Sequence, residues 1–150
     1  MKQHWIGKKT NGCRHLAQFP VDEILALRRP WEDTTRVVFH TEERRVKVQM
    51  NSIRYHLFAR SPVCACCGRV GTVMMLDVHG CMYSRAHFNL YCREGDKLIL
   101  MTRDHIVPRS CGGTDMLDNL QTLCTDCNNA KGDKNLSLNE LRTVLEEVAA

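Results

Sequence analysis

Two cysteine pairs of identical spacing constrain the fold of this chain more than any other feature. Cys64 and Cys67 form the first pair, and Cys124 and Cys127 form the second. Two thiolates three positions apart can point both sulfurs at one ion, so each pair supplies half of a tetrahedral zinc site. We therefore expect one structural zinc ion to join two segments that are distant in sequence.

Other ligand sets are possible. Cys66 could replace Cys64 or Cys67, but the two-residue spacing followed by Gly68 favours the outer cysteines. The total of 9 cysteines is odd and cannot pair fully, which argues for metal ligation and free thiols over disulfides. A second zinc site in the segment 68–103 is a less favoured alternative, because lone cysteines and histidines are more often packed residues; its ligands would be His79, Cys81, His87 and Cys92.

Length and composition fit one compact domain with an accessory segment. Two full domains would leave each half of the 150 residues with a marginal core. The chain is 43% hydrophobic and 25% charged, and no apolar stretch approaches the roughly 20 residues needed to span a bilayer. No secretory signal is visible at the start. We therefore expect a cytoplasmic protein.

Positive charge is concentrated in the first 60 residues. They hold 12 Lys/Arg against 6 Asp/Glu, whereas residues 61–150 hold 9 against 11. A polyphosphate ligand would therefore be attracted mainly by the first segment. This asymmetry divides the chain into a basic accessory segment, 1–60, and a second domain, 61–150. For single arginines such as Arg44 and Arg45, an ordinary solvated surface is the alternative to a phosphate contact.

In the first segment the pattern changes several times. Residues 1–19 lack periodicity and predict an irregular arm. Helical spacing predicts a short helix over 21–28, and alternating runs predict a basic hairpin over 36–50. A further helix is expected over 52–59, with Asn51 as its cap.

In the second domain we expect strands followed by helices. Apolar and alternating runs predict strands over 73–76, 86–91 and 98–101, the last two as an antiparallel pair that leads into Asp104 and His105. The segment 124–131 is predicted to be a short helix that Gly132 stops. Ser137 and Glu140 form a capping box that marks the start of a final packing helix.

Six short motifs make the chain resemble the HNH endonucleases of the ββα-metal, or His-Me finger, superfamily. They span residues 64–132 in this order: Cys64-x-x-Cys67-Gly68, Asp104-His105-Ile106-Val107-Pro108-Arg109-Ser110, Gly112-Gly113-Thr114-Asp115, Asn119-Leu120-Gln121, Cys124-x-x-Cys127-Asn128 and Lys131-Gly132. The implied fold class is α+β: a small zinc-stapled ββα-metal nuclease core, with an N-terminal helix and hairpin extension and a C-terminal packing helix.

The resemblance also implies an activity and its residues. His105, Asn119 and Asn128 take the positions of the three residues, His-Asn-His, that give the HNH family its name. Asparagine replaces the final histidine. His105 is expected to be the general base, because histidine titrates near neutral pH and can take a proton from water when a carbonyl, of the backbone or of Asn119, holds its other nitrogen. Asp104 and Asn128 offer oxygen ligands, which favour Mg²⁺ or Mn²⁺ as the catalytic ion.

The expected substrate is DNA, most simply a duplex. Arg109 and Lys131 are candidates for phosphate contacts near the cut, and Arg44 and Arg45 for contacts in the basic segment; plain exposure is the alternative for each. Two other functions stay open: a non-catalytic zinc-binding nucleic-acid adaptor, and an RNA-directed nuclease or a subunit of a larger complex. Asp104 and the three residues of the family name occur together, which favours an enzyme, because an adaptor needs neither a base nor an open metal site.

Overall fold

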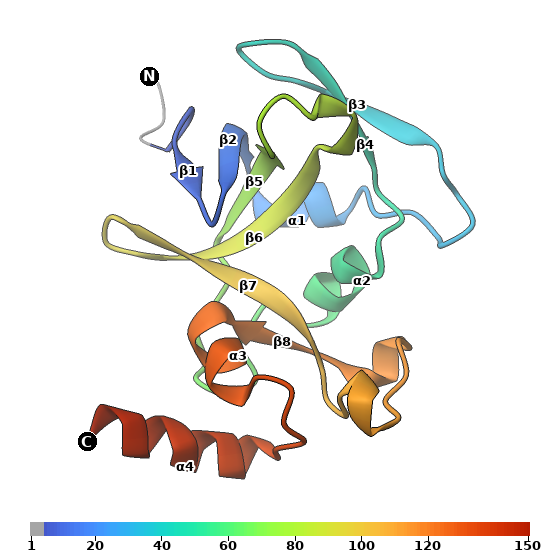
Figure 1. Cartoon of the computed structure of the whole chain (residues 1–150). Helices are drawn as coiled ribbons and strands as arrows, with labels where there is room; N and C mark the ends of the chain where they lie inside the picture. Colours follow the sequence, from blue (N-terminus) through green and yellow to red (C-terminus); the bar gives the residue numbers. More distant parts are fainter. Residues whose placement is uncertain (1–4) are drawn as a thin grey trace.

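The computed structural model describes residues 5–150 and is built around one antiparallel sheet (Figure 1). Its six strands follow the order β1-β2-β5-β6-β7-β8. Their bounds are Lys9–Thr10, Cys13–Phe19, Val73–Val78, His87–Glu94, Lys97–His105 and Leu120–Cys124. A separate hairpin consists of β3 (Arg36–His40) and β4 (Arg45–Gln49).

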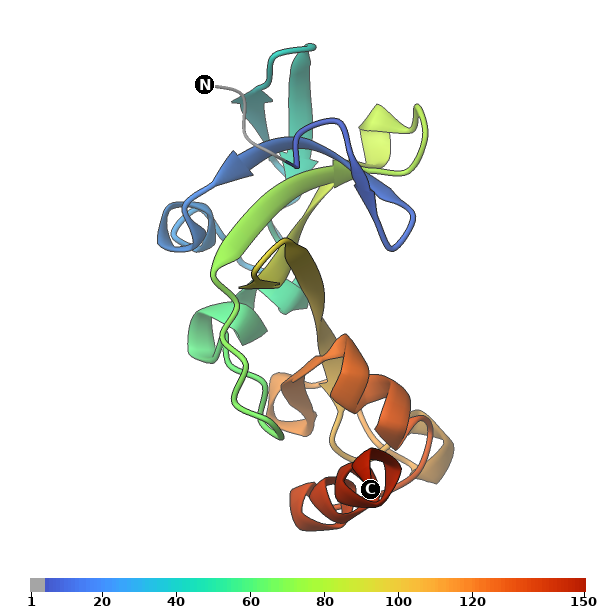
Figure 2. The same ribbon diagram turned by 90° about the vertical axis from the view of Figure 1, so that its left-hand side faces the viewer.

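Four α-helices and three short 3-10 helices complete the fold. The α-helices are α1 (Val21–Leu25), α2 (Ile53–Arg60), α3 (Thr125–Lys131) and α4 (Leu138–Ala149). The 3-10 helices are η1 (Tyr83–Arg85), η2 (Arg109–Cys111) and η3 (Leu117–Asn119). The β3–β4 hairpin lies at one end of the molecule and α4 at the other, as the two views agree (Figures 1 and 2). Within residues 5–150, no helix combines the length and the apolar character that a membrane crossing requires.

The α+β class is confirmed, and so is the strand-strand-helix unit that ends it. β7 pairs with β8 from Met101↔Cys124 to His105↔Leu120, and α3 follows β8 directly. Strand β7 continues from the predicted strand over 98–101 and ends at His105, so Asp104 and His105 lie at the end of a strand as expected. The capping box of α4 is present, with Ser137 and Glu140 exchanging side-chain and backbone hydrogen bonds.

The prediction of an irregular arm over residues 1–19 was wrong for the part that the structure describes. β1 and β2 form a hairpin there, and β2 pairs with the buried strand β5. A buried polar network explains why this edge lacks a simple apolar alternation: His15 contacts Asp77, and Asn89 donates to the other Asp77 oxygen over 2.8 Å. Residues 1–4 lie outside the described part.

The two expected segments, 1–60 and 61–150, share one sheet. β2 comes from the first segment and β5 from the second, and their side chains contribute to the same core. The stretch 68–103, whose place the sequence does not show, forms β5, β6 and most of β7 and is therefore the centre of the sheet.

Helix α2 begins one residue later than predicted. Its N-cap is Ser52, whose hydroxyl accepts from the backbone N–H of Arg54. Asn51 instead donates its side-chain amide to the carbonyl of Trp31 and so fastens the preceding loop. The cap nevertheless satisfies an orphan N–H at the helix start, as the sequence pattern requires.

Candidate active site

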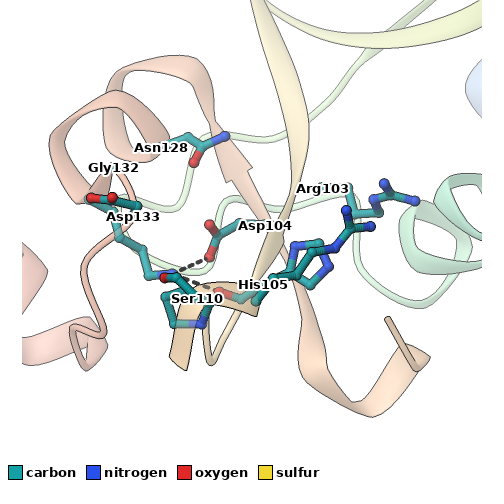
Figure 3. Close-up of a pocket in the computed structure, with 10 residues that line it drawn as sticks. Arg103, Asp104, His105, Ser110, Asn128, Gly132 and Asp133 are labelled. Carbon is teal, nitrogen blue, oxygen red and sulfur yellow. Dashed lines mark hydrogen bonds and ion pairs between the residues drawn. The ribbon is translucent and has the colours of Figure 1, made fainter. Parts of the chain in front are cut away.

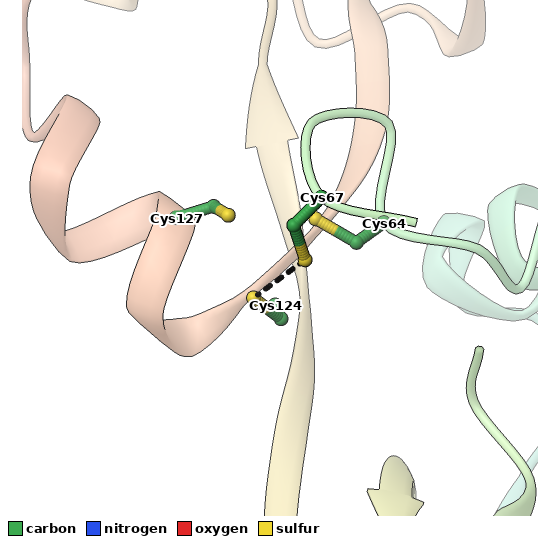
Figure 4. Close-up of side chains that lie close together, drawn as sticks. All are labelled: Cys64, Cys67, Cys124 and Cys127. Atoms are coloured by element: carbon green, nitrogen blue, oxygen red, sulfur yellow. Dashed lines mark hydrogen bonds between the residues drawn. The ribbon is translucent and has the colours of Figure 1, made fainter. Parts of the chain in front are cut away.

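The four predicted zinc ligands meet in space. The sulfurs of Cys64, Cys67, Cys124 and Cys127 all lie within 4.8 Å of one another (Figure 4). The sulfurs of Cys67 and Cys124 are 3.7 Å apart, close to the edge of about 3.8 Å that a tetrahedron of Zn–S bonds near 2.3 Å requires. This cluster is thus compatible with a zinc ion, and it excludes the sulfur of Cys66.

The backbone around the cluster favours a thiolate at Cys64. Burial raises the pKa of this thiol, but backbone hydrogen bonds at Cys67, Cys124 and Cys66 more than offset it and lower the pKa to about 7. A thiolate is the form that ligates a metal. Burial raises the pKa of Cys67 in the same loop to about 11, so these surroundings favour a single thiolate.

The alternative second zinc site is not formed. Within residues 5–150 the four cysteines above are the one group of three or more potential ligands close enough to share an ion. His79 instead contacts Cys13, with 3.2 Å between Nε2 and Sγ.

Asp104 and Asn128 bring two oxygen atoms toward each other from β7 and α3. The side-chain amide of Asn128 donates to Thr102 Oγ1 over 2.9 Å, which turns its carbonyl oxygen toward the Asp104 carboxylate (Figure 3). Because Asn128 follows the zinc-cluster residue Cys127 on the same helix, one helical turn serves both sites. The pair can hold a hard cation, for which oxygen ligands are the natural donors.

One oxygen of Asp104 is already engaged. Its Oδ2 accepts from Lys131 Nζ over 2.9 Å and from Gln121 Nε2 over 3.0 Å, and Lys131 also donates to the carbonyl of His105 over 2.7 Å. Within residues 5–150, Asp104 Oδ1 has no hydrogen-bond partner and is the oxygen left for an ion. Lys131 is only 1% exposed, so it occupies neither of the positions expected for it, a surface lysine or a phosphate contact, but supports the carboxylate from within.

His105 is held by a residue that sequence reasoning missed. Its Nε2 lies 2.7 Å from Asp115 Oδ1. A carboxylate accepts hydrogen bonds, so this contact assigns the proton to Nε2 and leaves Nδ1 able to receive one. Hydrogen bonds from His105 and Arg109 lower the pKa of Asp115 below its usual value, which keeps the carboxylate ionised at neutral pH.

Asn119 does not contact the His105 ring, contrary to the carbonyl arrangement that the resemblance suggested. Its side chain accepts from Val107 N and donates to Val107 O, both over 3.0 Å, and donates to Thr114 O over 2.8 Å. Its own carbonyl accepts from Ile106 N over 2.8 Å. Asn119 therefore cross-links the loop that carries Asp115 and acts on His105 through that loop.

The same loop requires a glycine at its centre. A Cβ at Gly113 would lie 1.7 Å from the carbonyl oxygen of Val107 and 2.9 Å from the Asn119 amide nitrogen. No rotamer change relieves a clash with backbone, so the second glycine of the Gly-Gly pair lets the loop close on Asn119.

A surface pocket of about 440 Å³ lies beside Asp104 and His105. Asp104, His105, Asn128 and Lys131 form part of its wall, together with Arg103, Arg109 and Ser110. Arg109 is exposed and donates its Nε to Asp115 over 2.7 Å. Its two terminal nitrogens have no partner within residues 5–150 and can meet an anion.

Arg44 and Arg45 lie at the other end of the molecule. They occupy the turn and the first residue of β4, opposite the end that carries α3 and α4 (Figures 1 and 2). The guanidinium carbon of Arg44 is 3.7 Å from the centre of the Tyr83 ring. The structure therefore does not bring either arginine to the pocket, and their contact with DNA stays a prediction.

One comparison with known families covers the segment that carries this pocket. A model of the HNH endonuclease family matches residues 90–134, which include all of β7, β8 and α3 and the residues Asp104, His105, Asn119 and Asn128. Neither the curated proteins nor the solved structures gave a match to the chain. The resemblance to HNH endonucleases is confirmed for this segment, and a segment of this family indicates a nuclease-type function.

Proposed function

We propose that this protein is a metal-dependent endonuclease that hydrolyses phosphodiester bonds of DNA. The observation that carries the proposal is that Asp104, His105 and Asn128 line one open pocket. Hydrolysis of a phosphodiester needs an in-line water, a base for its proton and a counter-charge for the phosphoryl oxygens. The pocket offers a base for the proton and oxygen ligands for an ion that would supply the counter-charge.

His105 would act as the general base through Nδ1. Asp115 holds the opposite nitrogen, Nε2, and stabilises the imidazolium that forms when Nδ1 takes a proton from water. The carbonyl of His105 is fixed by Lys131, so the backbone under the ring is also held. Asp115 is thus a positioning residue for the base.

Asp104 and Asn128 would hold a catalytic Mg²⁺ or Mn²⁺ ion. The donors fit this group, because both are hard oxygens and the ammonium of Lys131 leaves Asp104 Oδ1 available. When bound, such an ion neutralises charge on the phosphoryl oxygen and on the leaving 3′ oxygen. The four-cysteine cluster, built from sulfur alone, would hold zinc and take no part in the chemistry.

Arg109 would bind the phosphate at the rim of the pocket. Its Nε is tied to Asp115, which orients the guanidinium, and its terminal N–H groups remain free for phosphate oxygens. Asp115 would therefore orient both the general base, His105, and the phosphate-binding residue, Arg109. Cytoplasmic location and a duplex substrate are part of the proposal.

Relaxation of a supercoiled plasmid tests the function. We expect zinc-loaded protein to nick or linearise the plasmid when Mg²⁺ or Mn²⁺ is added, and to be inactive when EDTA removes the added ion while the zinc is retained. A structured RNA is incubated in parallel. Cleavage of the RNA alone would support the RNA-directed alternative, and binding without cleavage under every divalent ion would support the zinc-binding adaptor.

A further inference from the structure

Three surface hollows follow one another from the β3–β4 hairpin to the active-site pocket. The first, of about 330 Å³, is lined by the hairpin, η1 and the start of α2, and includes Arg36, Arg54 and Arg85. The second, of about 340 Å³, shares Ser52 and Arg54 with the first and extends along β7 to Arg103. Arg103 also lines the active-site pocket, so the three hollows are neighbours.

The strand pairing explains why the surface is hollowed here. β7 pairs with β6 only up to Leu100↔Tyr91, and from Met101 onward it pairs with β8. β6 continues instead beside β5, so β6 and β7 diverge (Figure 1). The start of α2 lies at this fork, where Arg54 donates to Phe88 O and to Asn89 Oδ1, each over 3.1 Å.

The charge along the hollows is one-sided. No aspartate or glutamate lines the first two, and the third contains Asp104 and Asp133. The four arginines of the first two hollows form no ion pair within the part of the chain that the structure describes; they are Arg36, Arg54, Arg85 and Arg103. Elsewhere on the molecule, Arg14 is neutralised by Glu43 and Arg69 by Glu94 and Asp126.

We propose that these hollows, here called the basic track, bind the phosphate backbone of duplex DNA on one side of the cleaved bond. The inference rests on the proposed nuclease function and gives its substrate a path. The exposed guanidinium groups of Arg36, Arg85 and Arg103, which form no ion pair, are natural partners of phosphates. Arg54 contributes its charge, while its two terminal nitrogens hold Phe88 and Asn89. The portion of β7 from Leu100 to His105 alone runs for about 17 Å at 3.3 Å per residue, which corresponds to about five steps of a duplex at 3.4 Å each.

The lining favours a duplex over a single strand. Proteins that hold single strands stack the bases on exposed aromatic side chains. The aromatic ring of Tyr55 in the first hollow is buried, so no base can stack on it, and its hydroxyl oxygen accepts a hydrogen bond from the backbone N–H of Phe88. Contacts to phosphates alone predict binding that depends strongly on salt and little on sequence.

The experiment measures the affinity for a labelled DNA duplex over a series of salt concentrations, by fluorescence anisotropy. The parent is zinc-loaded His105→Ala, so that the DNA is not cut. Arg36→Ala with Arg85→Ala removes two cations from the far end of the basic track. We expect weaker binding, and a slope of log K against log salt that is smaller in magnitude by about 1.8, because each lost duplex phosphate contact contributes about 0.9.

Two matched variants separate charge at the track from charge in general. Arg28→Ala with Lys97→Ala removes the same charge outside the three hollows and should leave the slope unchanged. Arg36→Lys with Arg85→Lys keeps the charge and should restore most of the slope, which excludes a simple folding defect.

Equal slopes for the track variant and the matched control would overturn the basic track while leaving the nuclease proposal intact. Binding of a single strand as tightly as the duplex would overturn the choice of duplex DNA. If the parent binds no DNA and the wild-type protein cleaves no plasmid, the proposed function falls, and the track falls with it.

Discussion

Replacing His105 with alanine is expected to reduce plasmid cleavage by about 10²- to 10⁴-fold, the usual contribution of a general base. Asp115 holds Nε2 of the imidazole, so Nδ1 is left to receive a proton. Rates of plasmid nicking under saturating Mg²⁺ measure the effect. The zinc content should stay at one ion per chain, because His105 is not part of the cysteine cluster.

His40→Ala is the matched control for this experiment. His40 is an exposed histidine on β3, far from the pocket, and its loss should leave cleavage unchanged. Undiminished cleavage by the His105→Ala protein, with zinc bound and the fold intact, would show that another group serves as the base.

Replacing Cys124 with serine is expected to remove the zinc and to abolish cooperative unfolding of the domain. Structural zinc contributes apparent binding free energies of about 10–16 kcal/mol in small modules, which is as large as the whole stability of an ordinary domain, about 5–15 kcal/mol. Cys124 also ends β8 and precedes α3, so its loss releases the helix that carries Asn128. Metal analysis and thermal unfolding followed by circular dichroism measure both effects.

Cys66→Ser tests the ligand assignment against the same background. Cys66 lies in the same loop and is buried, but its sulfur is outside the cluster. This variant should retain zinc. A Cys124→Ser protein that is metal-free yet unfolds cooperatively, or a Cys66→Ser protein that loses its zinc, would contradict the assignment.

The parts of the fold that were predictable depend on short-range patterns. The two Cys-x-x-Cys pairs, the strand that ends at His105, the short helix before Gly132 and the capping box at Ser137 each depend on neighbours within a few residues. Such patterns can be read from neighbouring residues, so the sequence alone was sufficient to predict them.

The parts that were missed depend on distant partners. β2 becomes a strand because β5 offers it an edge and because Asp77 satisfies the buried His15. Lys131 is buried, against the usual behaviour of lysine, because Asp104 lies where its ammonium can pair. These partners, Asp77 and Asp104, lie far along the chain from β2 and α3, so the local sequence of either element does not reveal them.

The residue that orients the base was present in the resemblance but was given no role. Asp115 is part of the Gly-Gly-Thr-Asp motif, and an acidic residue ten positions after a histidine carries no geometric signal by itself. The loop that returns it to His105 is closed by Asn119 and by the space at Gly113. The Asn119 side chain is committed to the loop backbone and is therefore not free to hold His105.

The central claim is that Asp104 and Asn128 hold one divalent ion beside His105. Titration of zinc-loaded protein with Mn²⁺, followed by the electron paramagnetic resonance signal of the free ion, tests it most directly. We predict one Mn²⁺ site per chain in the wild-type and His105→Ala proteins, weakened by roughly tenfold or more in Asp104→Ala and in Asn128→Ala, since even the loss of a supporting contact costs a metal site about that much. Binding of Mn²⁺ by both ligand variants with wild-type affinity would contradict the account.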